Sequence, residues 1–378
     1  MGMNTGKLTR FLHISPIAAP YHVKLAKKMR QYCDCQFWFY EQLTPGRPAW
    51  WAMELPDYCR VLKSIDFFRR QKYVVPNLWR ELNKFNPDVL LLYGVNIPSN
   101  YIAYRWARKH YKAVALFSET MRLNNKLRKR DWVIRVGEFL YRDIDLVFGS
   151  SQDSVVQLRE MYPSWRDRII ESKYPADLDS YFSHSLRKEK KAYVYFFPNR
   201  LIDIYNPLLA IEIFAELLQE YPGSTLKMNS DGELRDACNS LIDKLNIRHA
   251  VEFISEKVKT WDDMPRLYEE CDIMIFPAKF SNGNFTILEA MASGMGIIIT
   301  DNILGYAVQF IKNNHSGFIC DVSKKSFIQA VKKYIGQPRL FKQHAEINRK
   351  QVRSETCAAI AELHWRQLQE LMSKHSGK

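Results

Sequence analysis

The sequence predicts an α/β protein with two doubly wound domains. Short apolar segments, rich in β-branched and aromatic residues, alternate along the chain with segments of helical periodicity. This alternation is typical of parallel sheets covered by helices. It occurs in two successive sets, and a chain of 378 residues is longer than one hydrophobic core usually supports. We therefore expect two domains, each with its own sheet.

The expected strands are short apolar runs that end in polar, proline or glycine residues, the usual signals for a strand that enters a turn. The first set lies at 10–14, 36–40, 89–93, 113–117 and 146–148. The second set lies at 193–197, 225–228, 251–254, 273–276, 297–299 and 318–320. Because helical patterns separate the strands, we expect the strands within each set to pair in parallel.

A charged connector separates the two sets. Residues 183–191, SHSLRKEKK, form the most charged and least apolar connector of the chain, so we place a hinge linker there. The expected N-terminal domain then covers 1–182, and the expected C-terminal domain covers 192–352. Residues 353–378 have apolar side chains at helical spacing and form the expected final helix.

Composition describes a folded protein with reduced thiols. Hydrophobic residues make up 47% and charged residues 25% of the chain, and no apolar run approaches the roughly 20 residues that span a bilayer. Because no apolar stretch follows Lys7 and Arg10, we expect no signal peptide and a cytoplasmic location, with association at the inner face of the membrane as the alternative. The seven cysteines are scattered, and the pair Cys33 and Cys35 lacks the spacing of a zinc site, so we expect no bound metal.

The net charge of +14 predicts an anionic partner, which is nucleic acid, anionic lipid or an anionic substrate. Nucleic acid ranks lowest because no recognisable binding module accompanies the charge. The densest basic segment, 122–135, leads into an apolar stripe at helical spacing: Trp132, Val133, Val136, Phe139 and Leu140. We favour core packing for this stripe, and contact of the basic end and Trp132 with an anionic membrane surface is the alternative.

Residues 273–300, IMIFPAKFSNGNFTILEAMASGMGIIIT, predict a strand, a turn, a helix, a turn and a second strand. The apolar face resumes at Phe285 after a polar stretch, so the helix is expected to begin near Asn284. The first N–H groups of a helix lack intrahelical partners and carry the positive end of its dipole. We therefore expect the N–H groups of Asn284, Phe285 and Thr286 to bind a phosphate group, and Gly283 to let backbone approach it closely.

The stretch LEAMASG, at 288–294, resembles the donor-site motif of the GT-B glycosyltransferases related to glycosyltransferase family 4, the glycosyl transferases group 1. In that motif a second glutamate, followed by AMA and a small-residue turn, binds the ribose hydroxyls of a sugar nucleotide. The resemblance implies this role for Glu289, since a carboxylate accepts two hydroxyl hydrogen bonds. The first glutamate of the motif is absent, because Ser281 occupies its position.

The stretch 193–218, YVYFFPNRLIDIYNPLLAIEIFAELL, is similar to the strand and loop with which the family holds the donor pyrophosphate. The family uses an arginine and, five residues later, a lysine. The resemblance implies the first role for Arg200, whereas Tyr205 stands at the lysine position and offers a hydroxyl without a charge. The stretch VEFISEKV resembles the loop whose backbone meets the nucleotide base, which places Val258 at the base.

Other stretches extend the resemblance over most of the chain. Asp231, Gly232 and Glu233 match a strand end of the family, and KYPADLDSYF at 173–182 resembles its hinge signature. The resemblance implies the GT-B fold, in which two Rossmann-like domains face a cleft and the last helix crosses back onto the N-terminal domain. Trp365 is the expected anchor of that helix.

In addition to Arg200, two residues of the N-terminal half are candidate catalytic groups. Glu119 follows the strand 113–117, and strand ends at the cleft are where catalytic groups belong. His22 lies in a strand-to-helix loop that would approach the acceptor. A structural role is the alternative for both, for example a pair between Glu119 and Arg122.

The predicted function is transfer of a sugar from a nucleotide-sugar donor, linked to UDP, GDP or a similar nucleotide. The expected acceptor is a glycan or a lipid-linked glycan in cell-surface polysaccharide or lipopolysaccharide synthesis. No metal is required if helix dipoles and Arg200 stabilise the leaving phosphate. Family 4 implies retention at the anomeric carbon, whereas Glu119 as general base is compatible with inversion.

Two other functions compete with sugar transfer. Ser281 and Tyr205 favour a catalytically weakened GT-B protein that binds a sugar nucleotide or a partner glycosyltransferase without transfer. A nucleotide-sugar epimerase with the same fold is disfavoured, because LEAMASG resembles the transferase motif.

Overall fold

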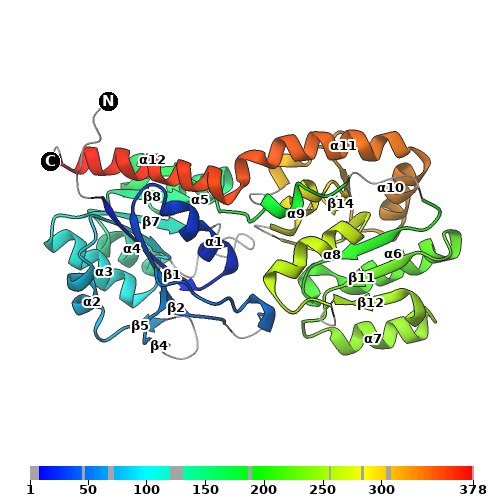
Figure 1. Ribbon diagram of the computed structural model, residues 1–378, viewed down its shortest axis with the longest axis horizontal. Helices are drawn as coiled ribbons and strands as arrows, with labels where there is room; N and C mark the ends of the chain where they lie inside the picture. Colours follow the sequence, from blue (N-terminus) through cyan, green and yellow to red (C-terminus); the bar gives the residue numbers. More distant parts are fainter. Residues whose placement is uncertain are drawn as a thin grey trace. The chain divides into compact units, whose positions relative to one another are not determined.

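The computed structural model describes residues 8–44, 47–66, 72–119, 131–185, 190–254, 257–281, 285–303 and 308–376. Its contacts divide the chain into two compact units, coloured along the sequence in Figure 1. Unit 1 contains Met1–Thr44, Ala52–Pro175 and Cys357–Lys378, and unit 2 contains Pro45–Trp51 and Ala176–Thr356. The hinge at 183–191 stays a prediction, since part of that connector lies outside the described residues.

The described residues of unit 1 form a parallel sheet of seven strands in the order β3-β2-β1-β6-β7-β8-β9. The strands are β1 (Arg10–Ile17), β2 (Asp34–Glu41), β3 (Cys59–Val61), β6 (Val89–Tyr93), β7 (Ala113–Ser118), β8 (Leu146–Gly149) and β9 (Ile169–Glu171). All strands expected in this part of the chain are present, and β3 and β9 add an edge on each side. β6 is buried along its whole length, as strands of parallel sheets usually are. The short strands β4 (Ile65–Asp66) and β5 (Tyr73–Val74) form a separate antiparallel pair.

Helices cover both faces of this sheet (Figure 1). The helix α1 packs against α12, and α2 packs against α3. Proline occupies the first turn of α1 and of α3, where the missing N–H is not needed. The Ser151 side chain caps α5 by accepting a hydrogen bond from the Ser154 N–H. The helices of unit 1 are α1 (Pro20–Met29), α2 (Leu78–Phe85), α3 (Pro98–Lys109), α4 (Asp131–Leu140), α5 (Gln152–Met161) and α12 (Cys357–Ser376).

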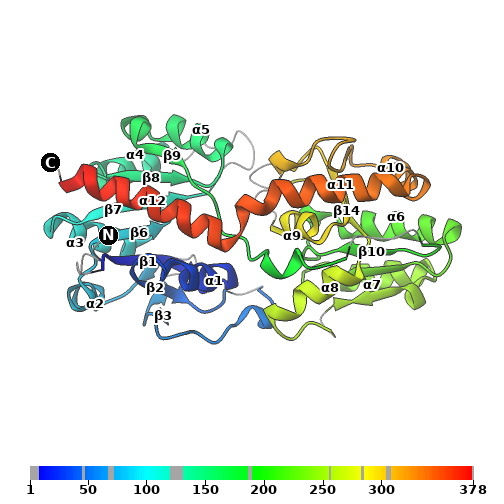
Figure 2. The same ribbon diagram turned by 45° about the horizontal axis from the view of Figure 1, so that its top comes forward.

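The final helix, α12, belongs to unit 1 and lies beside α1 in both views (Figures 1 and 2), which confirms the predicted return of the chain. The Trp365 ring stacks on Tyr32 with ring centroids 6.5 Å apart. The Gln367 side chain donates to the Glu171 carbonyl at 3.0 Å, next to the edge of the sheet. α12 begins at Cys357, later than expected, because the short 3-10 helix η11 (Val352–Glu355) precedes it.

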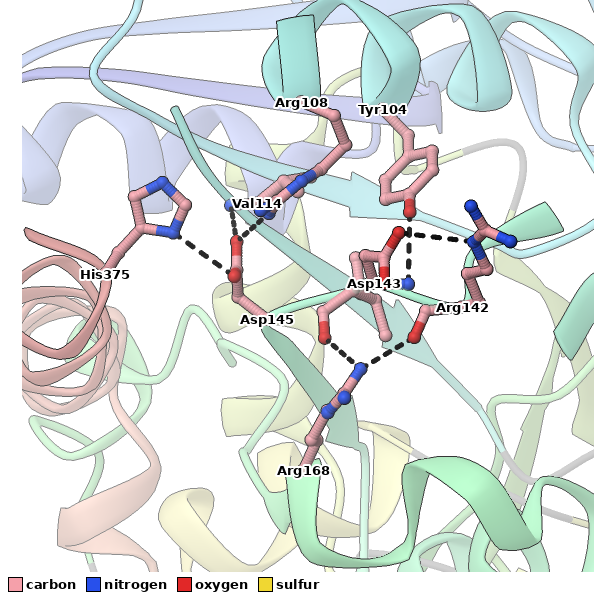
Figure 3. Close-up of polar contacts among 9 residues, drawn as sticks. Tyr104, Arg108, Val114, Arg142, Asp143, Asp145, Arg168 and His375 are labelled. Carbon is pink, nitrogen blue, oxygen red and sulfur yellow. Dashed lines mark hydrogen bonds and ion pairs between the residues drawn. The ribbon is translucent and has the colours of Figure 1, made fainter. Parts of the chain in front are cut away.

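Asp145 connects α12 to the rest of unit 1 (Figure 3). Its carboxylate is nearly buried, with 5% of the side chain exposed, and accepts hydrogen bonds from Arg108 of α3 at 2.7 Å and from the Val114 N–H of β7 at 3.0 Å. His375 of α12 lies 3.2 Å from the other carboxylate oxygen. One carboxylate therefore joins a strand and two helices that are far apart in the sequence.

The described residues of unit 2 form a parallel sheet of six strands in the order β12-β11-β10-β13-β14-β15. They are β10 (Val194–Phe197), β11 (Thr225–Met228), β12 (Val251–Phe253), β13 (Ile273–Phe276), β14 (Gly296–Thr300) and β15 (Phe318–Cys320), as the sequence predicts. This is the strand order of a Rossmann-like sheet, in which the direction of winding reverses between the first and fourth strands, here β10 and β13. Both units are thus doubly wound, which confirms the predicted fold class.

Six helices of unit 2 are described (Figure 1): α6 (Pro207–Glu220), α7 (Arg235–Lys244), α8 (Met264–Glu270), α9 (Phe285–Ser293), α10 (Lys324–Gly336) and α11 (Pro338–Gln351). Unit 2 also contains short 3-10 helices, of which η1 (Ala49–Trp51), η5 (Asp179–Tyr181), η6 (Asp203–Tyr205) and η9 (Trp261–Asp263) lie near the residues discussed below. The position expected for the start of α9, Asn284, lies outside the described residues.

The apolar stripe of α4 is largely exposed, so its interpretation as core packing is wrong for three residues. Trp132 is 69% exposed, Val136 45% and Phe139 68%. Ile134 and Leu140 pack instead against the core of unit 1. Periodicity identifies the apolar face of a helix but not what covers that face. The basic residues at 122, 126 and 128–130 lie outside the described residues.

Candidate functional site

The loops that follow β10 and β13 meet at the carboxyl edge of the unit 2 sheet. The N–H groups of Lys279 and Phe280, after β13, donate to the Ile204 carbonyl of η6 at 3.0 and 3.4 Å. A reversal of winding in an open α/β sheet creates a crevice at this edge, where ligands bind. The two segments that the sequence predicts to hold a donor therefore lie together, with Arg200 in one and the start of α9 in the other.

Arg200 is half-buried in a loop that is fixed by its backbone. The next residue, Leu201, donates its N–H to the Asp231 carbonyl at 2.7 Å and accepts from the Leu234 N–H at 2.8 Å. Gly232 lies against this loop with φ +146°, and a Cβ there would come 2.3 Å from the Leu201 carbonyl oxygen. Only glycine fits this position, because the backbone conformation and the close contact both exclude a side chain.

Replacing Gly232 with alanine is expected to displace the Arg200 loop and to destabilise the protein by roughly 2 to 4 kcal/mol, as strain and a backbone clash combine. Gly223→Ala is the matched control, since Gly223 also has positive φ, +85°, but its Cβ would lie 3.6 Å from the nearest atom. The difference between the free energies of unfolding of the two variants, measured in urea, separates the effect of the clash with Leu201 from the effect of positive φ. Equal losses of unfolding free energy would contradict the proposed close contact.

The first turn of α9 brings backbone N–H groups and a hydroxyl group to the same edge. α9 begins at Phe285, and the N–H groups of Phe285 and Thr286 belong to its first turn, at the positive end of the helix dipole. The Thr286 hydroxyl is buried and has no hydrogen-bond partner, and the same is true of the Asn199 side-chain nitrogen next to Arg200. Buried polar groups are normally paired, so two orphans at one edge favour a bound ligand. Gly283 and Asn284 lie outside the described residues.

Glu289 is buried in the second turn of α9, with 6% of the residue exposed. The Tyr268 hydroxyl of α8 donates to its Oε2 at 2.6 Å. Burial raises the pKa of Glu289 to about 7; the hydrogen bond from Tyr268 lowers it and the charge of Asp177 raises it further. The Tyr181 hydroxyl is buried without a partner, and its ring lies 5.2 Å from that of Tyr268. The carboxylate thus keeps acceptor capacity for hydroxyl groups of a ligand.

Three other positions singled out in the sequence lie in or near this edge. The Tyr205 ring packs 5.7 Å from the ring of Phe276, the last residue of β13. Ser281 is buried, and its backbone pairs with Ile303 as an isolated bridge. Val258 is buried, and its N–H donates to the Ile254 carbonyl at 2.9 Å. A role for Val258 at a base stays a prediction.

Unit 2 contains a cluster of three tryptophan side chains that sequence patterns did not predict. Trp261 of η9 lies 5.9 Å from the ring of Trp50 and 5.6 Å from that of Trp51. The Trp261 indole donates to Asp177 at 3.0 Å. Because about two hundred residues separate Trp50 and Trp51 from Trp261, no sequence pattern predicts that they meet. The two adjacent tryptophans in AWW at 49–51 are the one feature of this cluster that the sequence shows directly.

In unit 1, the structure brings Glu119 and His22 to one group of aromatic side chains. Glu119 is exposed one residue after β7, and the Tyr174 hydroxyl donates to its Oε1. His22 is buried in the first turn of α1, and its ring lies 6.4 Å from that of Tyr174 and 4.9 Å from that of Tyr93. The alternative partner of Glu119, Arg122, lies outside the described residues.

His22 is neutral near pH 7. Burial, together with the charge of His364, lowers the pKa of His22 to about 3, and its Nδ1 has no hydrogen-bond partner. A neutral imidazole is able to accept a proton or a hydrogen bond from a ligand hydroxyl. Tyr174 and Tyr93 were missed in the sequence, since tyrosines 81 residues apart carry no spacing signal. No group of three or more His, Cys, Asp or Glu side chains that could hold a metal ion occurs in the described ranges.

Residues 181–351 match the family model described as glycosyl transferases group 1. Among curated proteins, the chain is 24% identical over 140 residues to an uncharacterized glycosyltransferase of Haemophilus influenzae, covering 37% of this chain and 38% of that protein. It is 22% identical over 185 residues to an uncharacterized glycosyltransferase of Methanocaldococcus jannaschii, covering 49% and 45%. The match thus spans less than half the length of either relative.

Solved structures resemble the whole chain. A glycosyltransferase from Rickettsia africae superposes with a TM-score of 0.72 at 16% identity and covers 97% of this chain and 98% of its own. HepE of Anabaena, in complex with UDP, gives 0.69 at 13% identity over 96% and 100%. WaaG, a glycosyltransferase involved in lipopolysaccharide biosynthesis, gives 0.66 at 12% identity over 94% and 98%. At these identities the likeness establishes a shared fold.

Proposed function

We propose that the protein transfers a sugar from a nucleoside-diphosphate sugar to a hydroxyl group. The GT-B fold and the match of residues 181–351 to the model of the glycosyl transferases group 1 support this proposal. The observation that carries the proposal is the contact between the loops after β10 and β13, where the N–H groups of Lys279 and Phe280 donate to the Ile204 carbonyl. We propose that Arg200 in the first loop, with the start of α9 and Glu289 after the second, complements a pyrophosphate and a ribose.

In the proposed donor complex, Glu289 accepts hydrogen bonds from the ribose hydroxyls. Arg200 and the N–H groups of Phe285 and Thr286 bind the pyrophosphate, and Tyr205 donates one hydrogen bond to it. Gly283 and Asn284 extend the phosphate site, and Val258 contacts the base. The structure of HepE with UDP and UDP-glucose supports a uracil nucleotide as the first donor to test, with GDP sugars as the next.

The chemical step requires stabilisation of a leaving nucleoside diphosphate. As the anomeric C–O bond breaks, negative charge grows on the leaving phosphate, and the guanidinium of Arg200 and the positive end of α9 would stabilise it. We propose that this pair of groups makes a divalent metal unnecessary. Added EDTA should then leave turnover unchanged, whereas full loss of activity that Mg²⁺ restores would overturn the proposal.

Glu119 and His22 are the proposed acceptor-side groups. Tyr174 holds the Glu119 carboxylate at the end of β7, where it would meet an acceptor hydroxyl. The family resemblance favours retention at the anomeric carbon. Glu119 as general base would give inversion instead, and the anomeric configuration of the product, measured by NMR, distinguishes the two.

The proposed acceptor is a lipid-linked or lipopolysaccharide glycan at the cytoplasmic side of a membrane, which the exposed face of α4 and the net charge of +14 support. In the described parts of the chain, no helix is long and apolar enough to cross a bilayer. Apolar side chains at the surface, flanked by the exposed cations Arg135 and Arg142, suit an anionic membrane surface.

Replacing Trp132 and Phe139 with serine should lower the binding of the protein to vesicles of phosphatidylglycerol and phosphatidylcholine by roughly 10-fold or more, because two exposed aromatic side chains are lost. Val156→Ser is the control, since Val156 is 55% exposed on α5. Vesicle co-sedimentation measures the effect. Equal binding by both variants would remove α4 as the membrane contact.

Donor hydrolysis without acceptor tests the proposed function against the alternative, a binding protein without transfer. Ser281 and Tyr205 favour that alternative because each lacks the charge of the family residue. The protein is incubated with UDP-glucose, UDP-galactose, UDP-N-acetylglucosamine and GDP-mannose, and release of the nucleoside diphosphate is measured. Slow release from one of them is expected. Tight binding with no release, also in the presence of acceptor extracts, would favour the binding protein.

A further inference from the structure

Lys279 is a second cation at the edge of unit 2 where Arg200 lies. It follows β13 by three residues, and its N–H donates to the Ile204 carbonyl of η6 at 3.0 Å. Its ammonium group lies 2.5 Å from the Asp203 carboxylate, also in η6. The side chain is thus fixed against the segment that ends at Tyr205, although 76 residues separate Lys279 from Asp203.

This segment lacks the positive charge that a pyrophosphate site requires. Tyr205 supplies a hydroxyl without a charge, and Asp203, two residues earlier, adds a negative charge that repels an anion. In the proposed donor complex, Arg200 is the side-chain cation assigned to a pyrophosphate that carries two or three negative charges. A cation from a neighbouring strand end would correct this imbalance, and Lys279 stands at such a position.

We propose that Lys279 binds the pyrophosphate of the donor and replaces the cation that Tyr205 does not provide. The inference rests on the proposed function and assigns to Lys279 the role of a substrate-binding residue. On binding, the ammonium group leaves the carboxylate of Asp203 and contacts a phosphate oxygen. Tyr205 and Lys279 together then replace the single lysine that binds the pyrophosphate in the family motif.

The ion pair with Asp203 does not prevent this exchange. The Lys279 side chain is 49% exposed and that of Asp203 72%, and pairs so exposed hold their partners only weakly. Lysine has a flexible four-carbon stem and three donors that turn freely, so its ammonium group adapts to a phosphate. A diphosphate carries more negative charge than one carboxylate and attracts the cation more strongly.

A purely structural pair and a binding residue predict different behaviour for the two partners. If the pair only stabilises the fold, loss of either charge has the same small effect and neither changes ligand affinity. If Lys279 binds phosphate, its loss weakens binding, whereas neutralising Asp203 frees Lys279 and removes repulsion. The sign of the Asp203 effect therefore separates the two roles.

The test is isothermal titration of UDP and GDP into the wild type, Lys279→Met, Asp203→Asn and Lys324→Met. Lys324 is the matched control, because it is 48% exposed and pairs at 3.0 Å with Glu216 of α6, and neither residue takes part in the proposed donor complex. We expect roughly 10-fold weaker binding for Lys279→Met, binding at least as tight as the wild type for Asp203→Asn, and no change for Lys324→Met. Adding Tyr205→Lys to Lys279→Met should restore most of the affinity.

Unchanged affinity in Lys279→Met, or equal weakening in Lys279→Met and Asp203→Asn, would overturn the inference while leaving the donor site intact. Failure of the wild type to bind any nucleoside diphosphate is a different outcome, which overturns the proposed function and this inference together. Thermal unfolding of each variant without ligand shows that affinity changes do not come from misfolding.

Discussion

Arg200→Ala should reduce turnover of the donor by roughly 30- to 1,000-fold while the protein stays folded. The guanidinium is the charged group of the β10 loop that would stabilise the leaving phosphate, and loss of one such preorganised donor raises a barrier by about 2 to 4 kcal/mol. The loop itself should persist, because its contacts with Asp231 and Leu234 run through the backbone of Leu201. The rate of nucleoside diphosphate release measures the effect.

Arg248→Ala is the matched control for this variant. Arg248 is a half-exposed arginine of unit 2 that pairs with Asp243 at 2.9 Å on η7 (Arg248–Ala250), away from the β10 and β13 loops. Its replacement should leave turnover unchanged. An Arg200→Ala enzyme with the rate of the wild type would exclude Arg200 from the chemical step.

Glu289→Gln should weaken nucleotide binding by roughly 10- to 100-fold at pH 8, because hydrogen bonds to a charged acceptor are worth about 1.5 to 3 kcal/mol. The difference from the wild type should shrink as the pH falls through about 7, the raised pKa of Glu289, since the wild-type side chain then becomes neutral as well. Comparison of the two proteins at each pH cancels the titration of the nucleotide itself. A constant ratio from pH 6 to 8 would contradict binding by the ionised carboxylate.

The same pKa shift predicts the stability of the unliganded protein. The folded state holds the Glu289 proton up to about pH 7 and the unfolded state releases it near 4.5, so the folded state binds more protons in this window. The free energy of unfolding therefore falls as the pH rises from 4.5 to 7 and levels off above 7, by on the order of 3 kcal/mol in total. Tyr268, Tyr181 and Asp177 surround the carboxylate. Glu289→Gln should abolish this part of the pH dependence.

The fold could be predicted well because its signals are local. Strands such as β6 and β13 are buried along their whole length and give unbroken apolar runs. The edge strands β3 and β9 were missed, since each has three residues and only part of it is buried. The stripe on α4 was found but misinterpreted, because periodicity does not report whether another element covers a helix face.

The site could be predicted only in part, because its contacts join distant residues. Sequence motifs predict the roles of Arg200 and Glu289, but they do not predict which side chains surround these two residues. Tyr268 lies 21 residues from Glu289, and Tyr174 lies 55 residues from Glu119. No sequence pattern pairs such residues, and the raised pKa of Glu289 depends on the burial that the fold supplies. Lys279 was not singled out in the sequence for the same reason, because its partner Asp203 lies 76 residues away.

Thermal unfolding with UDP, GDP and ADP shows whether the unit 2 edge between β10 and β13 binds a nucleoside diphosphate. A ligand at 100 times its dissociation constant stabilises a protein by roughly 2.7 kcal/mol, which should raise the unfolding temperature by on the order of 5 °C. We expect such a rise with at least one nucleotide and its loss in Arg200→Ala and Glu289→Gln. No shift with any of the three at millimolar concentration would rule out a nucleotide site at this edge.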